Sequence, residues 1–352
     1  MKKLNVFRLG LLFAGCFLGA GYVSGQELRQ YFVVYGAMGY PGLLMAVALL
    51  YVFGVLCLRL AQRTGLEQAD QLVVPWRAPL LHGLVMLLES LFLFALVTIM
   101  CAGVGALLEQ LFGLAHWAGS LIFALLVLAC TLAGLQSIVS AFSVSVPLLV
   151  AATVVFGAVA LIQNGGLPAP QPASGSGNAL LGGWLFSAVN FACYNILSTV
   201  AILAPFGRHI RNKSTVYGGL AFGSLLLLCI ALSVILSLNV WPEAQSAELP
   251  MLQAAAALGP FAKYCYALLL FAGMFGSALS NAVAFVNYYT VKFPALRPRR
   301  ALLASLTVAL AYLASLFGFG SLIGTLYPLF GYASAVFLVL MLLHALRLRK
   351  AA

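Results

Sequence analysis

Apolar runs of about 20 residues, the length that crosses a bilayer as a helix, recur from one end of the chain to the other. Several runs, such as residues 220–238, are apolar on every face, whereas a surface helix of a soluble protein keeps one polar face. The pattern therefore predicts an all-α polytopic membrane protein. The runs predict ten helices near residues 5–34, 37–61, 79–112, 115–134, 137–163, 180–205, 215–240, 257–290, 301–318 and 322–346.

Residues 164–178 form the one stretch that reads as a linker, with Gly165-Gly166, three prolines and Ser-Gly repeats. This linker divides the chain into residues 1–163 and 179–352, each with five predicted helices. Each half opens with a helix that we expect to be interrupted and has an unusually long third helix. Because five is odd, the second half enters the membrane from the opposite side. This layout predicts a 5+5 inverted repeat with a substrate site at the two interruptions.

The composition agrees with a membrane protein, at 64% hydrophobic and 7% charged residues. The net charge of +11 comes from short basic clusters between the apolar runs. Such clusters orient a chain in the membrane, and here they place both termini in the cytoplasm, so no nucleic-acid partner is expected. The Lys2-Lys3 start resembles a signal peptide, but the following run leads into a glycine-rich stretch and Gln26-Glu27, so we expect the first helix to be retained.

The seven cysteines fall inside or at the edge of apolar runs without metal-ligand spacing. We expect free thiols, no structural metal and no cofactor. No metal-binding cluster or nucleophile with a base appears within the spans, so an enzyme is not expected.

The first apolar run contains the motif Gly19-Ala20-Gly21-Tyr22-Val23-Ser24-Gly25-Gln26-Glu27. Glycine costs a helix interior about 1 kcal/mol relative to alanine, and a carboxylate at bilayer depth costs roughly 2.5 kcal/mol or more. Glycines here permit an unwound segment, and a half-helix starting near Ser24 would present free N–H groups to a substrate carboxylate. The alternative is a close helix contact through small residues. The candidate substrate-binding residues of this motif are Gly19, Gly21, Tyr22, Ser24 and Gly25.

This nine-residue motif resembles the Gly-Ala-Gly-Phe-Ala-Ser-Gly-Gln-Glu signature of the YkvI-type bacterial membrane proteins of the amino acid-polyamine-organocation superfamily. It is similar, more distantly, to the Gly-Ser-Gly-Ile-Phe segment of amino acid permeases. The resemblance implies the LeuT fold, with substrate bound at interruptions of helices one and six, in a bacterial cytoplasmic (inner) membrane. It implies no particular substrate.

The sixth predicted helix carries polar residues where the repeat requires a second interruption. Asn190 and Tyr194 are four residues apart and share one face of an intact helix. Asn195 would cap the inner half-helix. Hydrogen bonding between helices is the alternative role of each single residue. We nevertheless count all three as candidate substrate-binding residues because of their place in the repeat.

Five further residues are candidates for ion coupling. Glu27 and Glu89 are carboxylates within spans, where such groups face a cavity or a partner. In sodium-coupled members of the superfamily, hydroxyl oxygens of the eighth helix join carbonyls of the first interruption around sodium, which implies a role for Ser277, Ser280 or Asn281 here. Close packing of small residues is the alternative.

The sequence thus predicts a secondary transporter of a small amino acid or related zwitterion, coupled to sodium or protons and working by alternating access. Its partners would be the lipid bilayer and this small molecule, and the sequence makes no prediction of oligomeric state. A membrane sensor or receptor subunit of the same fold that binds an amino acid without moving it is the alternative. An ion channel is less natural with two interrupted helices.

Overall fold

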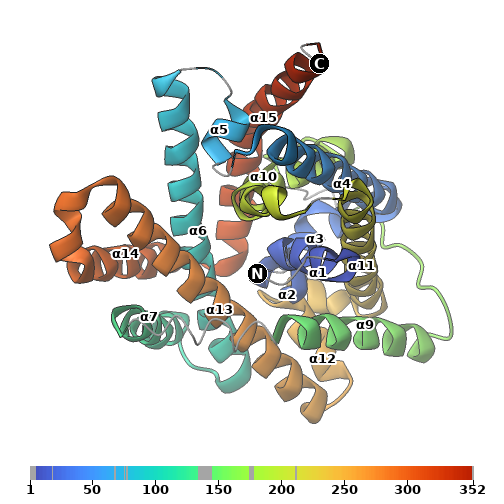
Figure 1. Ribbon diagram of the computed structural model, residues 1–352. Helices are drawn as coiled ribbons and strands as arrows, with labels where there is room; N and C mark the ends of the chain where they lie inside the picture. Colours follow the sequence, from blue (N-terminus) through green and yellow to red (C-terminus); the bar gives the residue numbers. More distant parts are fainter. Residues whose placement is uncertain are drawn as a thin grey trace.

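The computed structural model describes residues 5–17, 19–66, 69–74, 76, 78–133, 145–173, 178–210 and 212–350, and each regular element among them is a helix (Figure 1). The helices within the ten predicted spans are α1 (Val6–Phe17), α2 (Ala20–Ser24), α3 (Gln26–Tyr31), α4 (Gly39–Thr64), α6 (Pro79–Phe112), α7 (His116–Leu132), α9 (Ser145–Gln163), α10 (Trp184–Leu203), α11 (Lys213–Val240), α13 (Pro260–Lys292), α14 (Arg300–Ser315) and α15 (Phe319–Lys350). Shorter elements are α5 (Ala69–Val73), α12 (Pro250–Ala257), η1 (Val33–Met38), η2 (Ala204–His209), η3 (Pro242–Ser246) and η4 (Pro294–Arg299).

The long helices start and stop where local chemistry demands. Proline occupies the first turn of α6 and α13, where its missing N–H costs nothing. Gly65 and Gly113 end α4 and α6 in the left-handed conformation that suits glycine. The two expected long third helices are confirmed at 34 residues for α6 and 33 for α13.

Five helical stretches among the described residues are long and apolar enough to cross a membrane: α4 together with η1, α6, α11, α13 and α15. The other apolar helices within the predicted spans are shorter. The first part of the predicted helix 137–163, up to residue 144, lies outside the described residues.

The segment α1 to α3 lies in the interior of the helix bundle (Figure 1). α1 packs on α11 and α10, while α2 contacts α12 and α13, and α3 contacts α10 and α15. A second group forms where α6 packs on α7, α13 and α14. The first helix is therefore surrounded by elements from distant parts of the chain.

The prediction that the sixth helix is interrupted is wrong, because α10 is one continuous α-helix from Trp184 to Leu203. Its sequence contains neither glycine nor proline, so nothing forces the backbone out of the helix. Asn195 does not cap an inner half-helix either. Its amide Nδ2 donates to the Phe191 carbonyl 3.0 Å away, one turn earlier in the same helix.

Candidate functional site

The interruption expected in the first helix is confirmed, and it is centred on Gly25. This residue separates α2 from α3 with φ +83°, a left-handed conformation that L side chains rarely adopt. A Cβ there would also lie 3.0 Å from Met251 Cγ of α12. A second change of direction occurs at Gly19, whose backbone is extended at φ −81° and ψ 174°. The outer half-helix therefore begins at Gln26, two residues after the expected start near Ser24.

The protein itself satisfies backbone groups released by the interruption. The Tyr266 hydroxyl of α13 donates to the Val23 carbonyl at 2.7 Å and lies 3.1 Å from Thr153 Oγ1 of α9. Ser24 Oγ donates to the Gly21 carbonyl at 3.2 Å and accepts from the Gln26 N–H at 3.4 Å. Tyr266 is fully buried, and a buried tyrosine in an apolar helix needs such a partner. The sequence does not distinguish it from Tyr264, two residues earlier in α13, which is exposed.

The Glu27 side chain folds back across the interruption onto α2. A Cβ added to Gly21 would lie 2.7 Å from Glu27 Oε2, so the missing side chain makes room for the carboxyl group. The Tyr194 hydroxyl of α10 donates to Glu27 Oε1, and the Asn195 side chain is a further hydrogen-bond partner. Glu27 is 3% exposed and has no basic partner among the described residues, where the one ion pair joins Asp70 and His82. Two sequence candidates, Glu27 and Tyr194, thus meet directly.

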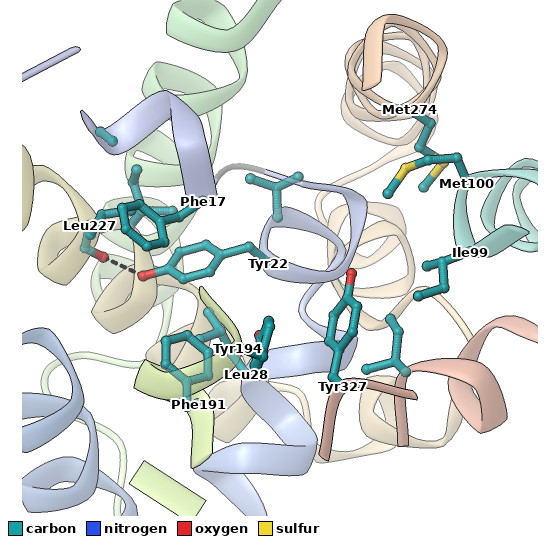
Figure 2. Close-up of a cluster of buried hydrophobic side chains, with 14 of the residues drawn as sticks. Phe17, Tyr22, Leu28, Ile99, Met100, Phe191, Tyr194, Leu227, Met274 and Tyr327 are labelled. Carbon is teal, nitrogen blue, oxygen red and sulfur yellow. Dashed lines mark hydrogen bonds between the residues drawn. The ribbon is translucent and has the colours of Figure 1, made fainter. Parts of the chain in front are cut away.

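Tyr194, which donates to this carboxyl group, belongs to an aromatic cluster, and Figure 2 shows it beside Phe191 and Tyr327. The Tyr194 ring stacks on Tyr327 of α15, with ring centroids 4.6 Å apart and planes 20° apart. Tyr31 of α3 and Phe191 also lie against Tyr194, with centroid separations of 5.8 and 5.7 Å. Tyr31 and Tyr327 were not singled out in the sequence, since only the packing of α3 and α15 on α10 brings them here.

Tyr22 and Asn190 lie beside the cluster but bind other partners. The Tyr22 hydroxyl donates to the Leu227 carbonyl of α11 at 2.8 Å (Figure 2). Asn190 Oδ1 accepts from the Tyr31 hydroxyl at 3.0 Å, and its Nδ2 donates to the Pro328 carbonyl of α15 at 2.9 Å. These two residues connect α2, α3, α10, α11 and α15.

Glu89 of α6 lines a separate, water-sized cavity of about 10 Å³. Its Oε1 is buried and has no hydrogen-bond partner among the described residues. The other cavity walls come from α15, from Val73 and Val85, and from α10 residues that follow Tyr194 by up to six positions, about 9 Å along the helix axis. The Glu89 cavity thus reaches the turns of α10 that follow Tyr194, the partner of Glu27.

Ser277, Ser280 and Asn281 are bonded within α13. Ser280 Oγ donates to the Gly276 carbonyl at 2.7 Å, and Asn281 Nδ2 donates to the Ser277 carbonyl at 2.8 Å. The α13 residue that reaches the interruption is Tyr266, not one of these three. Among the described residues no group of three His, Cys, Asp or Glu side chains could hold a metal ion, and the seven cysteines are free thiols.

A polar cavity of about 280 Å³ lies on another side of α3. Gln26, Arg29 and Gln30 line it together with residues 246–248 and the start of α15. Glu248 Oε2 accepts from the Gly320 N–H at 2.6 Å, which satisfies a free donor in the first turn of α15. The motif that carries Glu27 therefore also contributes polar side chains to this cavity.

Comparison with curated proteins finds two relatives from Bacillus subtilis (strain 168) that match nearly the whole chain, while no family model matches. The uncharacterized membrane protein YkvI is 24% identical over 340 residues, covering 96% of this chain and 95% of YkvI. The uncharacterized protein YyaD is 26% identical over 359 residues, covering 95% of each. The chain is thus similar along its length to these two proteins, one of them named as a membrane protein.

Solved transporter structures share the fold of this chain. Mhp1 in its inward-facing conformation matches with a TM-score of 0.67 at 14% identity, over 95% of this chain and 75% of Mhp1. Mhp1, a nucleobase-cation-symport-1 family transporter, also matches in a closed conformation with bromovinylhydantoin bound. The TM-score is then 0.56 at 13% identity, over 94% of this chain and 75% of Mhp1. A manganese transporter of Eremococcus coleocola matches with a TM-score of 0.54 at 16% identity, over 95% of this chain and 76% of the transporter. These are LeuT-fold transporters, so the chain has their fold.

Proposed function

We propose that this chain is a secondary active transporter of a small amino acid or related zwitterion that works by alternating access. The observation that carries the proposal is the Glu27 carboxyl group, buried where the first helix is interrupted and bonded to Tyr194 of α10. A buried carboxyl group without a basic partner is expensive in a membrane protein and is expected where a cation or proton binds. The fold shared with Mhp1 and the manganese transporter supports transport in general.

In this proposal the residues around the first interruption, with Asn190, Tyr194 and Asn195, form the substrate site. Glu27 and Glu89 take part in coupling to sodium or protons, and Ser277, Ser280 and Asn281 would contribute oxygen ligands if sodium is the ion. Residues 1–163 and 179–352 act as the two halves of an inverted repeat, joined by 164–178. The chain lies in a cytoplasmic membrane with both termini inside, as its basic clusters favour.

Uptake into proteoliposomes tests the proposal. Wild-type protein should accumulate at least one radiolabelled amino acid when a sodium or proton gradient is imposed, whereas Glu27→Gln, which keeps the size of the side chain, should lose accumulation or its dependence on the gradient. Glu243→Gln is the matched control, because Glu243 is exposed outside the site.

Wild-type kinetics and ion dependence in Glu27→Gln would refute the role given to Glu27. Saturable binding of an amino acid by the wild type without any flux would instead favour the sensor of the same fold.

A further inference from the structure

The short helix α5 lies between α4 and α6 and packs on α6 and α15, at the end of the bundle near the C-terminus (Figure 1). Its apolar residue Val73, together with Val74, packs against Val85 of α6 and Phe337 of α15. Val73 and Val85 also form part of the wall of the Glu89 cavity. The α5 segment, residues 69–74 and 76, therefore contributes Val73 to one side of that cavity.

Two hydrogen bonds from one imidazole connect this segment to α6. His82 Nδ1 lies 2.9 Å from Asp70 Oδ2, and His82 Nε2 lies 3.1 Å from the Trp76 carbonyl oxygen. A carbonyl oxygen and an ionised carboxylate only accept hydrogen bonds. With Asp70 ionised, both contacts are hydrogen bonds only when both ring nitrogens carry a proton. His82 is 24% exposed and can exchange its proton with water.

A second histidine contacts the same segment in a different way. His344 Nδ1 of α15 lies 2.8 Å from the Leu72 carbonyl oxygen, its one hydrogen bond to the described residues. One N–H is enough for this contact, and a neutral imidazole has one. Arg347 of α15 lies over the Trp76 ring at 4.8 Å. The hydrogen bond between α15 and the segment therefore does not require a doubly protonated imidazole.

We propose that the proton on His82 is a switch that keeps the α5 segment in place over the Glu89 cavity, and that loss of this proton opens the cavity on that side. A neutral His82 has one N–H for two acceptors, so either Asp70 or Trp76 loses its hydrogen bond and the ion pair is lost with it. The switch is separate from the substrate site at Glu27 and does not depend on which substrate is carried.

The elements that pack against α5 and α6 carry charged and titratable groups of both signs. These groups are Asp70 on α5, Glu89 on α6, Arg63 in the last turn of α4, Tyr288 and Lys292 on α13, and His344 and Arg347 on α15. Asp70 is the one that contacts His82 directly. Replacing Asp70 by a residue whose side chain forms no hydrogen bond should therefore have the same effect as removing the proton from His82.

Hydrogen exchange of the full-length protein in lipid nanodiscs tests this proposal, with the Val74 amide, which bonds to the Asp70 carbonyl at 2.8 Å, as the reporter. Protection, meaning the exchange rate relative to an unstructured peptide at the same pH, should fall about tenfold between pH 6 and pH 8, the loss expected for one hydrogen bond to a charged group. His82→Gln and Asp70→Ala should be poorly protected at both pH values. His344→Gln is the matched control, since it removes the other contact to the segment and should keep the tenfold fall.

A second measurement follows the cavity itself. In a chain without its seven native cysteines, Ser334→Cys places a thiol in the wall of the Glu89 cavity. At pH 6 a thiol reagent should label it about tenfold faster in the His82→Gln background than with His82 present, and at pH 8 the two rates should be equal. Comparing backgrounds at one pH cancels the ionisation of the thiol. Unchanged protection between pH 6 and pH 8, or a pH-dependent fall that persists in His82→Gln, would overturn the proposal.

Discussion

Replacement of Gly21 by alanine tests how the Glu27 carboxyl group is held. The new Cβ would lie 2.7 Å from Glu27 Oε2 and 3.2 Å from Ile323 Cδ1, whereas ordinary contact begins at 3.4 Å. The carboxyl group would have to move by about 0.7 Å, which takes its other oxygen, Oε1, away from the Tyr194 hydroxyl that donates to it. Losing a hydrogen bond to a charged group costs about 1.5–3 kcal/mol. Alanine in place of glycine inside α2 stabilises the folded protein by about 0.5–1 kcal/mol.

The free energy of unfolding should therefore fall by about 1–2 kcal/mol in Gly21→Ala. Thermal unfolding of the purified protein in detergent measures it, and the expected decrease in Tm is roughly 2–4 °C. Gly19→Ala is the matched control, because a Cβ there meets nothing within 4 Å and the φ of −81° suits alanine. It should leave Tm unchanged or slightly raised.

A double-mutant cycle isolates the contact between the two residues. In a Glu27→Ala background the methyl group of Gly21→Ala has no carboxyl group to displace, so the substitution should become neutral or stabilising by about 0.5 kcal/mol. If Gly21→Ala is as stable as Gly19→Ala when Glu27 is present, the carboxyl group is not held against α2 and the reasoning fails.

Two further predictions concern the interruption itself. Tyr266→Phe should lower the free energy of unfolding by about 1–3 kcal/mol, because the Val23 carbonyl loses its donor; Thr153→Val should cost less in the same thermal assay, and equal costs would contradict this ranking. Gly25→Ala should cost at least 1–2 kcal/mol, because an L residue at φ +83° is strained and its Cβ would lie 3.0 Å from Met251 Cγ; a Tm equal to that of the wild type would contradict it.

The sequence predicts the long helices well because their ends carry chemical signals. The prediction 79–112 matches α6 at both ends, and 215–240 matches α11 to within two residues, since proline, glycine or charge follows or precedes each apolar run. The short helices α5 and α12 were not predicted, because each is too short to show a period. The error at α10 came from imposing the repeat on a segment without glycine or proline, although that absence was visible in the sequence.

The candidate site was predicted in part. Gly25 and Glu27 were recognised because a glycine and a carboxylate are both costly within an apolar helix. Glu27 and Tyr194, which the sequence analysis named as an ion-coupling and a substrate-binding candidate, are in direct contact. The reason for Gly21 lies in tertiary structure, since its missing side chain accommodates a carboxyl group six residues later. No local pattern reports such a contact.

The bond between Glu27 and Tyr194 joins residues 167 positions apart, so it has a consequence for how the protein is made. During synthesis the first helix must enter the membrane long before α10 exists. Glu27 then has no tyrosine to bind, and its insertion costs roughly 2.5 kcal/mol or more. A chain truncated before α10 should therefore keep its first helix poorly inserted and be open to proteolysis. Synthesis of α10 would supply Tyr194 and so stabilise the inserted first helix.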